Sequence, residues 1–326
     1  MKRNLLIAVA LLATLTVGAQ NIAVVSPSNA TTIYQTLDEA IINAESGSII
    51  YLPGGGFPVS NNAVIDKQLT IMGVSHRGDT DNVDGATIIS GNLNFKEGAS
   101  HSSIVGLYVS GYINVKDSVA GFTARYCNVK SFQVSSSKSS GMVINQCFIR
   151  ALSDFNSCNV TLENNIMHSI REINGGIINH NIITSNSVWE SGYSGTYAMY
   201  SVQSSTITNN FILSGGSSFH SGDNCFASNN CRGTASWGEN PIVLAEGAKW
   251  EDIFVSNKGV NIYSDYHLKT GVKLDKGLDG TDIGIYGGSG FSDQALAPIP
   301  RIVSKKVDEM TDGTGRLRIE VTVKAN

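Results

Sequence analysis

Charged residues are scarce in this chain, making up 15% of its 326 positions. No cluster of Lys and Arg occurs and the formal net charge is −4, which argues against nucleic acid as a partner. No Cys-x-x-Cys spacing occurs either, so we expect no metal site of that kind. We also predict no cofactor. No catalytic signature stands out, so this sequence predicts a fold more readily than a function.

Long apolar runs are also missing, apart from one at the N-terminus. Lys2 and Arg3 precede a run from Leu5 to Val17, which is too short to span a bilayer. Val17 and Ala19 are small residues at positions −3 and −1 relative to a cleavage site after Ala19. We therefore predict a signal peptide over residues 1–19, in preference to a membrane anchor. We therefore expect a protein without a membrane span, secreted or periplasmic, from a Gram-negative bacterium.

Glycine, with 34 residues, and abundant Asn and Ser favour a β-rich, turn-rich protein. Seven short segments between residues 104 and 231 resemble one another. The residues that we align in these segments are Tyr108, Cys127, Cys147, Asn165, Asn181, Asn210 and Asn230. Most of the steps between them are close to twenty residues, a period that predicts stacked units, none of which buries its apolar face alone.

Residues 36–46 are predicted to form an amphipathic helix that covers the open edge of the first unit. Thr36 and Glu39 have the spacing of a capping box, and Gly47 is expected to end the helix. A strand over residues 49–52 and a turn over residues 53–56 should follow.

Two stretches carry a specific resemblance. Residues 47–55 read Gly-Ser-Ile-Ile-Tyr-Leu-Pro-Gly-Gly, and residues 67–73 read Lys-Gln-Leu-Thr-Ile-Met-Gly. Together with the helix, they resemble the opening of the pectin-lyase-like right-handed parallel β-helix superfamily, and in particular its uncharacterised exported bacterial members. The resemblance covers roughly residues 30–290 and implies an all-β solenoid. It implies little about function, because that superfamily includes lyases, hydrolases and adhesins.

The predicted domain extends over residues 20–297 and includes an insertion over residues 185–203. Residues 277–288 resemble the closing motif of exported bacterial β-helix proteins, with tight turns expected at the last coil. Beyond them, residues 298–326 are expected to form a strand pair, with residues 301–309 as one partner, that packs on the C-terminal coils as a cap.

The five cysteines leave at least one thiol unpaired. Cys127 and Cys147 share a register and should be neighbours in adjacent coils, close enough for a disulfide. We favour buried thiols, because the equivalent positions hold Asn and Tyr and indicate a stacked ladder.

Three consecutive register residues are each followed, three residues later, by a basic side chain or a histidine: Lys130, Arg150 and His168. If the repeats are stacked in register, these three residues should form a row along the stack. Asp154 and Glu172 follow on the next wall. One interpretation is a groove for an acidic glycan, in which these residues and Arg171, beside Glu172, include the base and charge neutraliser of a β-elimination. The favoured interpretation is a solvated outward row with local ion pairs, because outward positions must be polar.

The insertion over residues 185–203 carries Trp189, Glu190, Tyr193 and Tyr197. Aromatic faces stack on sugar rings, and long loops often carry binding sites. Packing of these aromatic side chains against the coil wall is the equal alternative. The acidic stretch over residues 79–85 partly resembles a calcium loop, but Val83 replaces an oxygen ligand there, so we favour a solvated turn and predict no metal.

The leading hypothesis is an exported, non-catalytic protein that binds a polysaccharide or another cell-surface partner. A polysaccharide lyase acting on an acidic glycan is the alternative, and a structural surface protein is the second. The paired aspartates and the Arg-Ile-Lys run of polygalacturonase-like enzymes do not occur here. Calcium-dependent pectate lyases have a cluster of Asp and Glu beside a catalytic Arg, and this sequence offers at best a reduced version of that cluster. The oligomeric state is left open.

Overall fold

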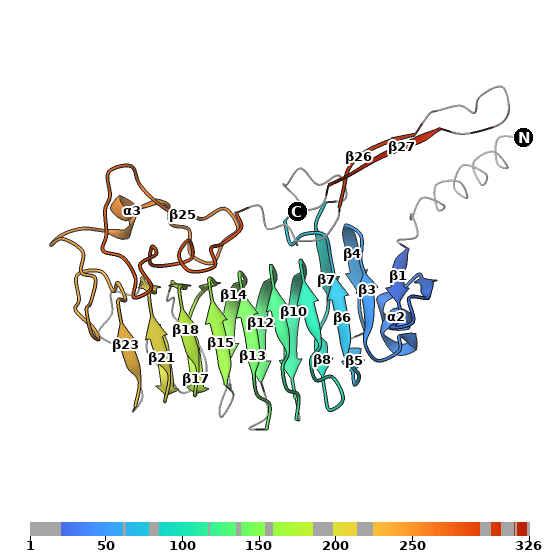
Figure 1. The fold of residues 1–326 in the computed structure, drawn as a ribbon, viewed down its shortest axis with the longest axis horizontal. Coiled ribbons are helices and arrows are strands. Elements are labelled where there is room, and N and C mark those ends of the chain that lie inside the picture. The colour runs from blue at the N-terminus through green and yellow to red at the C-terminus, as the bar shows by residue number, and fades with distance from the viewer. Residues whose placement is uncertain are drawn as a thin grey trace, which may run out of the picture.

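The computed structural model shows a chain made mostly of β-strands (Figure 1). The structure describes residues 21–60, 63–77, 85–116, 118–134, 138–153, 159–184, 198–213, 224–293, 301–307, 316 and 318–324. The predicted signal peptide lies outside these residues and stays a prediction. Within the described residues, no helix has the length and apolar character needed to cross a membrane.

One long sheet has the strand order β2-β1-β3-β6-β9-β11-β13-β15-β18-β21-β23. From β3 onward, every strand pairs in parallel with its equivalent in the next repeat, as Ala124 does with Ile144. The strands are β1 (Ile22–Val25), β2 (Thr31–Tyr34), β3 (Ser48–Tyr51), β6 (Leu69–Met72), β9 (Ser103–Val105), β11 (Thr123–Arg125), β13 (Met142–Asn145), β15 (Val160–Glu163), β18 (Ile177–Asn179), β21 (Thr206–Thr208) and β23 (Phe226–Ser228).

The second long sheet is also parallel, and its longer strands pair with different neighbouring strands at their two ends. The first residues of β10 pair with β7, whereas its last residues pair with β8, and the register shifts between Val109 and Tyr112. The strands are β4 (Gly55–Pro58), β5 (Ala63–Ile65), β7 (Thr87–Ser90), β8 (Leu93–Phe95), β10 (Tyr108–Val115), β12 (Asn128–Val134), β14 (Phe148–Ser153), β16 (Ile166–Met167), β19 (Ile182–Ile183) and β22 (Phe211–Ile212). A separate parallel pair is formed by β17 (Ile170–Asn174) and β20 (Met199–Gln203).

The core lies between these sheets and is built from columns of equivalent side chains. Alternate residues of a strand point to opposite faces, so every second residue enters the core, as Leu69 and Ile71 of β6 do. Val129, Ile149 and Met167 form one such column, and each is at most 1% exposed. Burying each such side chain contributes about 1.5–3 kcal/mol, and the gain is realised only when neighbouring repeats are stacked.

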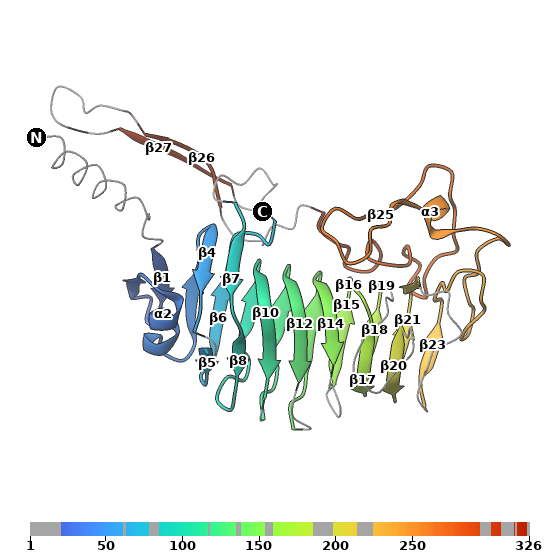
Figure 2. The ribbon, with the colours of Figure 1, turned by 180° about the vertical axis from the view of Figure 1, so that it is seen from behind.

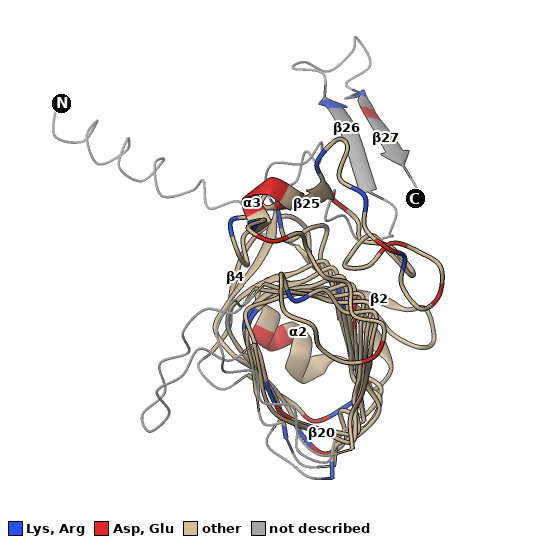
Figure 3. Ribbon diagram, turned by 90° about the vertical axis from the view of Figure 1, so that its left-hand side faces the viewer, with Lys and Arg blue, Asp and Glu red and all other residues tan. Residues whose placement is uncertain are grey.

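The N-terminal end carries a helix, α2 (Leu37–Asn43), as predicted. The Thr36 side chain accepts a hydrogen bond from the Glu39 amide at 3.2 Å, and Leu37 is buried. The helix ends at Asn43 instead of near Gly47, because Ala44 already has an extended backbone. In Figure 3, which looks along the stack, the repeats superpose as one outline and α2 is seen within it.

Two details of the sequence-based prediction are wrong: the register of the first copy and the turn over residues 53–56. Tyr108 pairs with Asn128, so the residue equivalent to Cys127 in the first copy is Leu107. That copy has no polar residue at the ladder position, which is why the sequence alignment slipped by one. Gly55 and Gly56 belong to strand β4 instead of forming a turn, since the β4 backbone pairs with β7.

Residues 232–293 fold back over one wall of the stack (Figures 1 and 2). They include α3 (Trp250–Ile253) and the antiparallel pair β24 (Phe254–Ser256) and β25 (Asp265–Leu268). Residues 277–293, the return segment, bond successively to Asn209, Asn164 and Gln146, and so run back across the repeats. The prediction that this motif makes its turns at the last coil is therefore wrong.

The C-terminal strands β26 (Arg301–Val307) and β27 (Ile319–Lys324) form an antiparallel pair, as predicted. The packing of this pair on the C-terminal repeats stays a prediction. Figures 1 and 2 draw the pair nearer β4 and β7 than β23.

Candidate functional site

An apolar row lies on the outward side of the second sheet, beneath residues 232–293. Phe148, Ile166, Ile182 and Phe211 pair in register along it, and each is at most 3% exposed. They belong to a second apolar cluster; for example, the rings of Phe211 and Phe254 are 4.9 Å apart. The expectation that outward positions must be polar is therefore wrong for this row. Its signal in the sequence is the consecutive apolar pairs, which indicate strands buried on both faces.

The turn before each of these strands presents a side chain to the return segment. Gln146, Asn164, His180 and Asn209 all have positive φ values between 52° and 60°. The Asn164 side-chain amide donates to the carbonyl of Gly287 at 2.8 Å, and the amide of Ser292 donates to Gln146 Oε1 at 2.8 Å. These turns therefore hold the return segment in place.

His180 makes another of these contacts, with the side chain of Asp279. The His180 side chain is fully buried, and its Nε2 atom lies 2.9 Å from Asp279 Oδ2. Burial raises the pKa of Asp279, but hydrogen bonds from His180 and Thr281 outweigh it and lower that pKa below its ordinary value. This pair fastens the return segment to the stack and belongs to the fold.

The charged row predicted from the sequence is confirmed as a row. The pairs Val129 with Ile149 and Ile149 with Met167 set Lys130, Arg150 and His168 at equivalent positions of successive repeats. Lys130 and Arg150 are exposed, and His168 is half-buried. The row lies on the same face as the covered apolar row, two residues further along each strand.

Two interactions give the row its electrostatic character. The Lys130 Nζ atom lies 5.7 Å from the ring centroid of Tyr112, an arrangement typical of a cation–π contact. Burial lowers the pKa of His168, and the positive charge of Arg150 lowers it further. Both effects favour the neutral form of His168, next to a permanent cation.

Arg171 and Glu172 lie on a different strand pair. Both belong to β17, where Arg171 pairs with Tyr200 of β20 and its Cζ atom lies 5.9 Å from that ring centroid. Tyr200 was expected in the insertion over residues 185–203. That boundary is wrong, because residues 199–203 form a strand in register with β17. The structure thus separates Arg171 and Glu172 from the row formed by the other three residues.

Several predicted site residues lie outside the described residues. These are Asp154, Trp189, Glu190, Tyr193 and Tyr197, together with most of the acidic stretch over residues 79–85. In the part of the chain that the structure does describe, no group of three or more His, Cys, Asp or Glu side chains is placed to hold a metal ion.

The ladder that includes Cys127 and Cys147 is structural. Both cysteines are buried free thiols, as predicted. The amide of Cys147 donates to Asn165 Oδ1 at 2.9 Å, and the amide of Asn165 donates to Asn181 Oδ1 at 2.9 Å. Asn210 and Asn230 continue the same pattern, so each rung satisfies a buried backbone amide.

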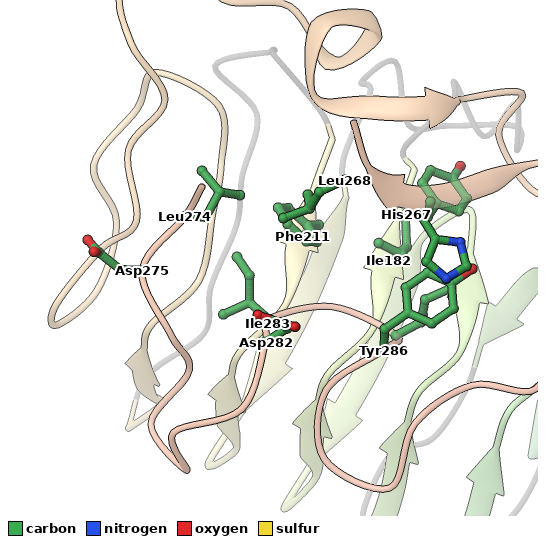
Figure 4. A pocket seen from close by; sticks show the side chains of 11 residues that line it. Ile182, Phe211, His267, Leu268, Leu274, Asp275, Asp282, Ile283 and Tyr286 are labelled. Atoms are coloured by element: carbon green, nitrogen blue, oxygen red, sulfur yellow. The ribbon is translucent and has the colours of Figure 1, made fainter. Parts of the chain in front are cut away.

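A polar cluster that the sequence did not indicate lies where β25 meets the end of the return segment. His267 stacks on Tyr286, with ring centroids 3.8 Å apart (Figure 4). Asp265 and Asp293 flank His267 on its two nitrogen atoms. A cavity of about 160 Å³ lies beside this stack, lined by Ile182 and Phe211 of the covered wall and by residues 266–286 of the covering segment. An Asp-x-His pair at the start of β25 was the available signal, but it is weak by itself.

Comparison with known proteins assigns no family to the chain. No protein-family model matches it, and no curated protein is similar to it.

Proposed function

We propose that the chain is an exported right-handed parallel β-helix protein, similar to the pectin-lyase-like superfamily, that binds an acidic glycan without cleaving it. The fold part of the proposal is supported by parallel pairing between residues about twenty positions apart, as for Thr123 with Val143. Parallel sheets whose strands recur at one period, with the chain passing from wall to wall in every repeat, are typical of β-helices.

The row of Lys130, Arg150 and His168 carries the binding part of the proposal. Adjacent strands lie roughly 4.8 Å apart, so the row presents cations at regular intervals along the stack. Among the described residues, no carboxylate forms an ion pair with Lys130 or Arg150. A polymer with a carboxylate on successive sugars could pair with both, and Tyr112, which is 43% exposed, offers a ring face beside them.

The covered wall favours binding over cleavage. A polymer that crossed the second sheet would meet the return segment, because the outward side chains of Phe148, Ile166 and Phe211 are already buried beneath residues 232–293. Among the residues that the structure describes, the margin of that face, where Lys130 and Arg150 are exposed, is the part left open to a polymer chain. A strand-aligned, solvent-exposed margin suits a binding surface better than it suits a water-excluding reaction site.

Binding of polygalacturonate and alginate to the protein, measured by calorimetry at low and moderate salt, tests this proposal. We expect affinity that falls with salt and that drops about tenfold or more in Lys130→Ala/Arg150→Ala. The matched control is Lys96→Ala/Lys273→Ala, which removes two exposed cations elsewhere and should leave affinity nearly unchanged. Equal affinity in both double variants would contradict a site on this row.

A lyase remains the second candidate, because one observation favours it. A neutral His168 beside Arg150 is a base next to a charge neutraliser, the pair that a β-elimination needs. The absorbance of unsaturated uronate products, followed with the same two glycans, distinguishes the two functions. Product formation that disappears in His168→Ala would establish the lyase and overturn the non-catalytic proposal; binding without product would exclude it.

A further inference from the structure

An open hollow of about 560 Å³ lies on the outer side of the His267–Tyr286 stack. Its polar lining comes from three distant parts of the chain: Arg77, residues 258–267 and Asp293. The volume is within the range of about 300–1,000 Å³ that is usual for small-molecule sites. None of its lining residues belongs to the row of Lys130, Arg150 and His168.

His267 is held in one orientation at the edge of this hollow. Its Nδ1 atom lies 2.8 Å from Asp265 Oδ1, and its backbone amide donates to the same oxygen at 3.0 Å. The stack on Tyr286 holds the ring plane. A carboxylate on Nδ1 places the proton of a neutral imidazole there, so Nε2 is left as an acceptor.

Asp293 is held opposite to it. Its Oδ1 atom accepts a hydrogen bond from the Tyr286 hydroxyl at 2.7 Å, and its backbone carbonyl accepts one from Arg77 Nη1 at 3.1 Å. The second carboxylate oxygen, Oδ2, lies 3.7 Å from His267 Nε2. That separation is too long for a direct hydrogen bond, so the two atoms stand as neighbouring acceptors at one edge of the hollow.

Two adjacent acceptors match two adjacent hydroxyl donors. One hydroxyl of a vicinal pair can donate to Nε2 of His267 and the other to Oδ2 of Asp293. Tyr263, which is 60% exposed and lines the same hollow, offers an aromatic face of the kind that packs against sugar rings. The two cations of the lining, Arg77 and Lys258, balance the formal charges of Asp265 and Asp293, so the site favours a neutral ligand.

We propose that this hollow binds a single neutral sugar ring through vicinal hydroxyls, with His267 and Asp293 as hydrogen-bond acceptors and Tyr263 against the ring. The site is separate from the cationic row and does not depend on acidic-glycan binding there.

Ligand-observed NMR and calorimetry with four neutral probes test the proposal on the full chain: the methyl glycosides of glucose, galactose, mannose and N-acetylglucosamine. We expect at least one of them to bind with a dissociation constant in the millimolar range. His267→Phe, which keeps an aromatic ring against Tyr286, and Asp293→Ala should each weaken that binding about tenfold or more, since each removes one acceptor of the hydroxyl pair. The Lys130→Ala/Arg150→Ala protein should bind the sugar as the unchanged chain does.

Failure of all four sugars to bind, or binding that survives both His267→Phe and Asp293→Ala, would overturn the proposal. Since His267 also packs on Tyr286, circular dichroism and the thermal midpoint should accompany each variant. Tyr263→Ala changes an exposed side chain and tests the same hollow without disturbing that stack. We expect it to weaken sugar binding severalfold, whereas unchanged binding would remove the aromatic face from the site.

Discussion

The Nε2 atom of His180 lies 2.9 Å from Oδ2 of Asp279, a residue 99 positions later in the chain. The histidine is fully buried, whereas the Asp279 side chain is 40% exposed. The side-chain amide of Asn209 also reaches His180 Nε2, at 3.2 Å. The return segment is therefore joined to the stack by a charge-assisted contact at its first turn, before it crosses the earlier repeats.

Replacing Asp279 with alanine should loosen this contact. We expect a loss of about 0–1 kcal/mol of stability, because the exposed side of the carboxylate is screened by solvent. The folded-state pKa of Asp279 is lowered, so its contribution is present above the ordinary Asp value of about 3.9 and is lost as the pH falls through the lowered value. Thermal midpoints measured from neutral to acidic pH should converge for the two proteins. A constant difference throughout would contradict this; Asp275→Ala, an exposed carboxylate nearby, is the control.

The asparagine ladder should be costly to interrupt. Asn181 accepts from the Asn165 amide at 2.9 Å and donates to the Leu162 carbonyl at 2.8 Å, with no exposure to solvent. In Asn181→Ala both partners stay buried without their hydrogen bonds, at about 1–3 kcal/mol each. Urea unfolding should show this loss, whereas Asn43→Ala, on the exposed end of the N-terminal helix, should lie within about 0.5 kcal/mol of the unchanged protein. Similar losses in both variants would count against the ladder.

The return segment can be displaced by one methyl group. A Cβ at Gly287 would lie 1.7 Å from the Asp282 carbonyl oxygen, a backbone atom that cannot move without the segment. We expect Gly287→Ala to expose the covered apolar row, with faster proteolysis and increased binding of a hydrophobic dye. Gly56→Ala is the matched control, because the φ of Gly56, like that of Gly287, lies outside the left-handed region, and a Cβ there meets no atom within 4 Å. Equal protease resistance would show that the segment tolerates the methyl group.

The buried thiols should be unreactive in the folded protein. Burial and the neighbouring Cys127 raise the pKa of Cys147 well above its ordinary value, and burial raises the pKa of Cys231 to about 12. Because the thiolate is the reactive form, iodoacetamide at neutral pH should label these three cysteines only after unfolding. Cys225, which is only partly buried, should react first among the described cysteines. Peptide mapping without reductant checks the assignment, and a Cys127–Cys147 disulfide would contradict it.

Acidic-glycan binding should strengthen as the pH falls. His168 has a pKa below its ordinary value of about 6.5, so the row gains its third cation only at pH values below that lowered pKa. Calorimetric affinity for polygalacturonate should therefore rise there, while Lys130 and Arg150 remain charged throughout. His168→Gln should bind with little change over the same range. If both proteins showed the same rise, the titrating group would lie elsewhere.

Much of the repeat architecture could be predicted from the sequence. Spacings near twenty residues put Cys127 beside Cys147, and the same spacings put Lys130 beside Arg150. These predictions succeeded because parallel pairing between equivalent residues transfers a linear period directly into a spatial stack. The first copy failed because Leu107 has no polar side chain to mark the ladder position.

The return segment and the hollow could not be predicted in the same way. Asn164 and Gly287 are 123 residues apart, and the hollow combines Arg77 with His267 and Asp293. No period connects such positions, so their meeting depends on how the chain docks after the last repeat. The pairs Phe148-Ile149 and Ile182-Ile183 could have indicated that the wall is covered, against the expectation of polar outward positions, but not which segment covers it.

By itself, the sequence determined the stacking period, the buried ladder, the capping helix and the members of the charged row, because each depends on residues at fixed spacing along the chain. Only the tertiary structure decided which outward faces are open. Residues 232–293 cover Phe148 and Phe211 but leave Lys130 and Arg150 exposed, and they bring His267 to Asp293. That choice results from apolar burial and hydrogen bonds between remote segments, whose free energy is not encoded in local patterning.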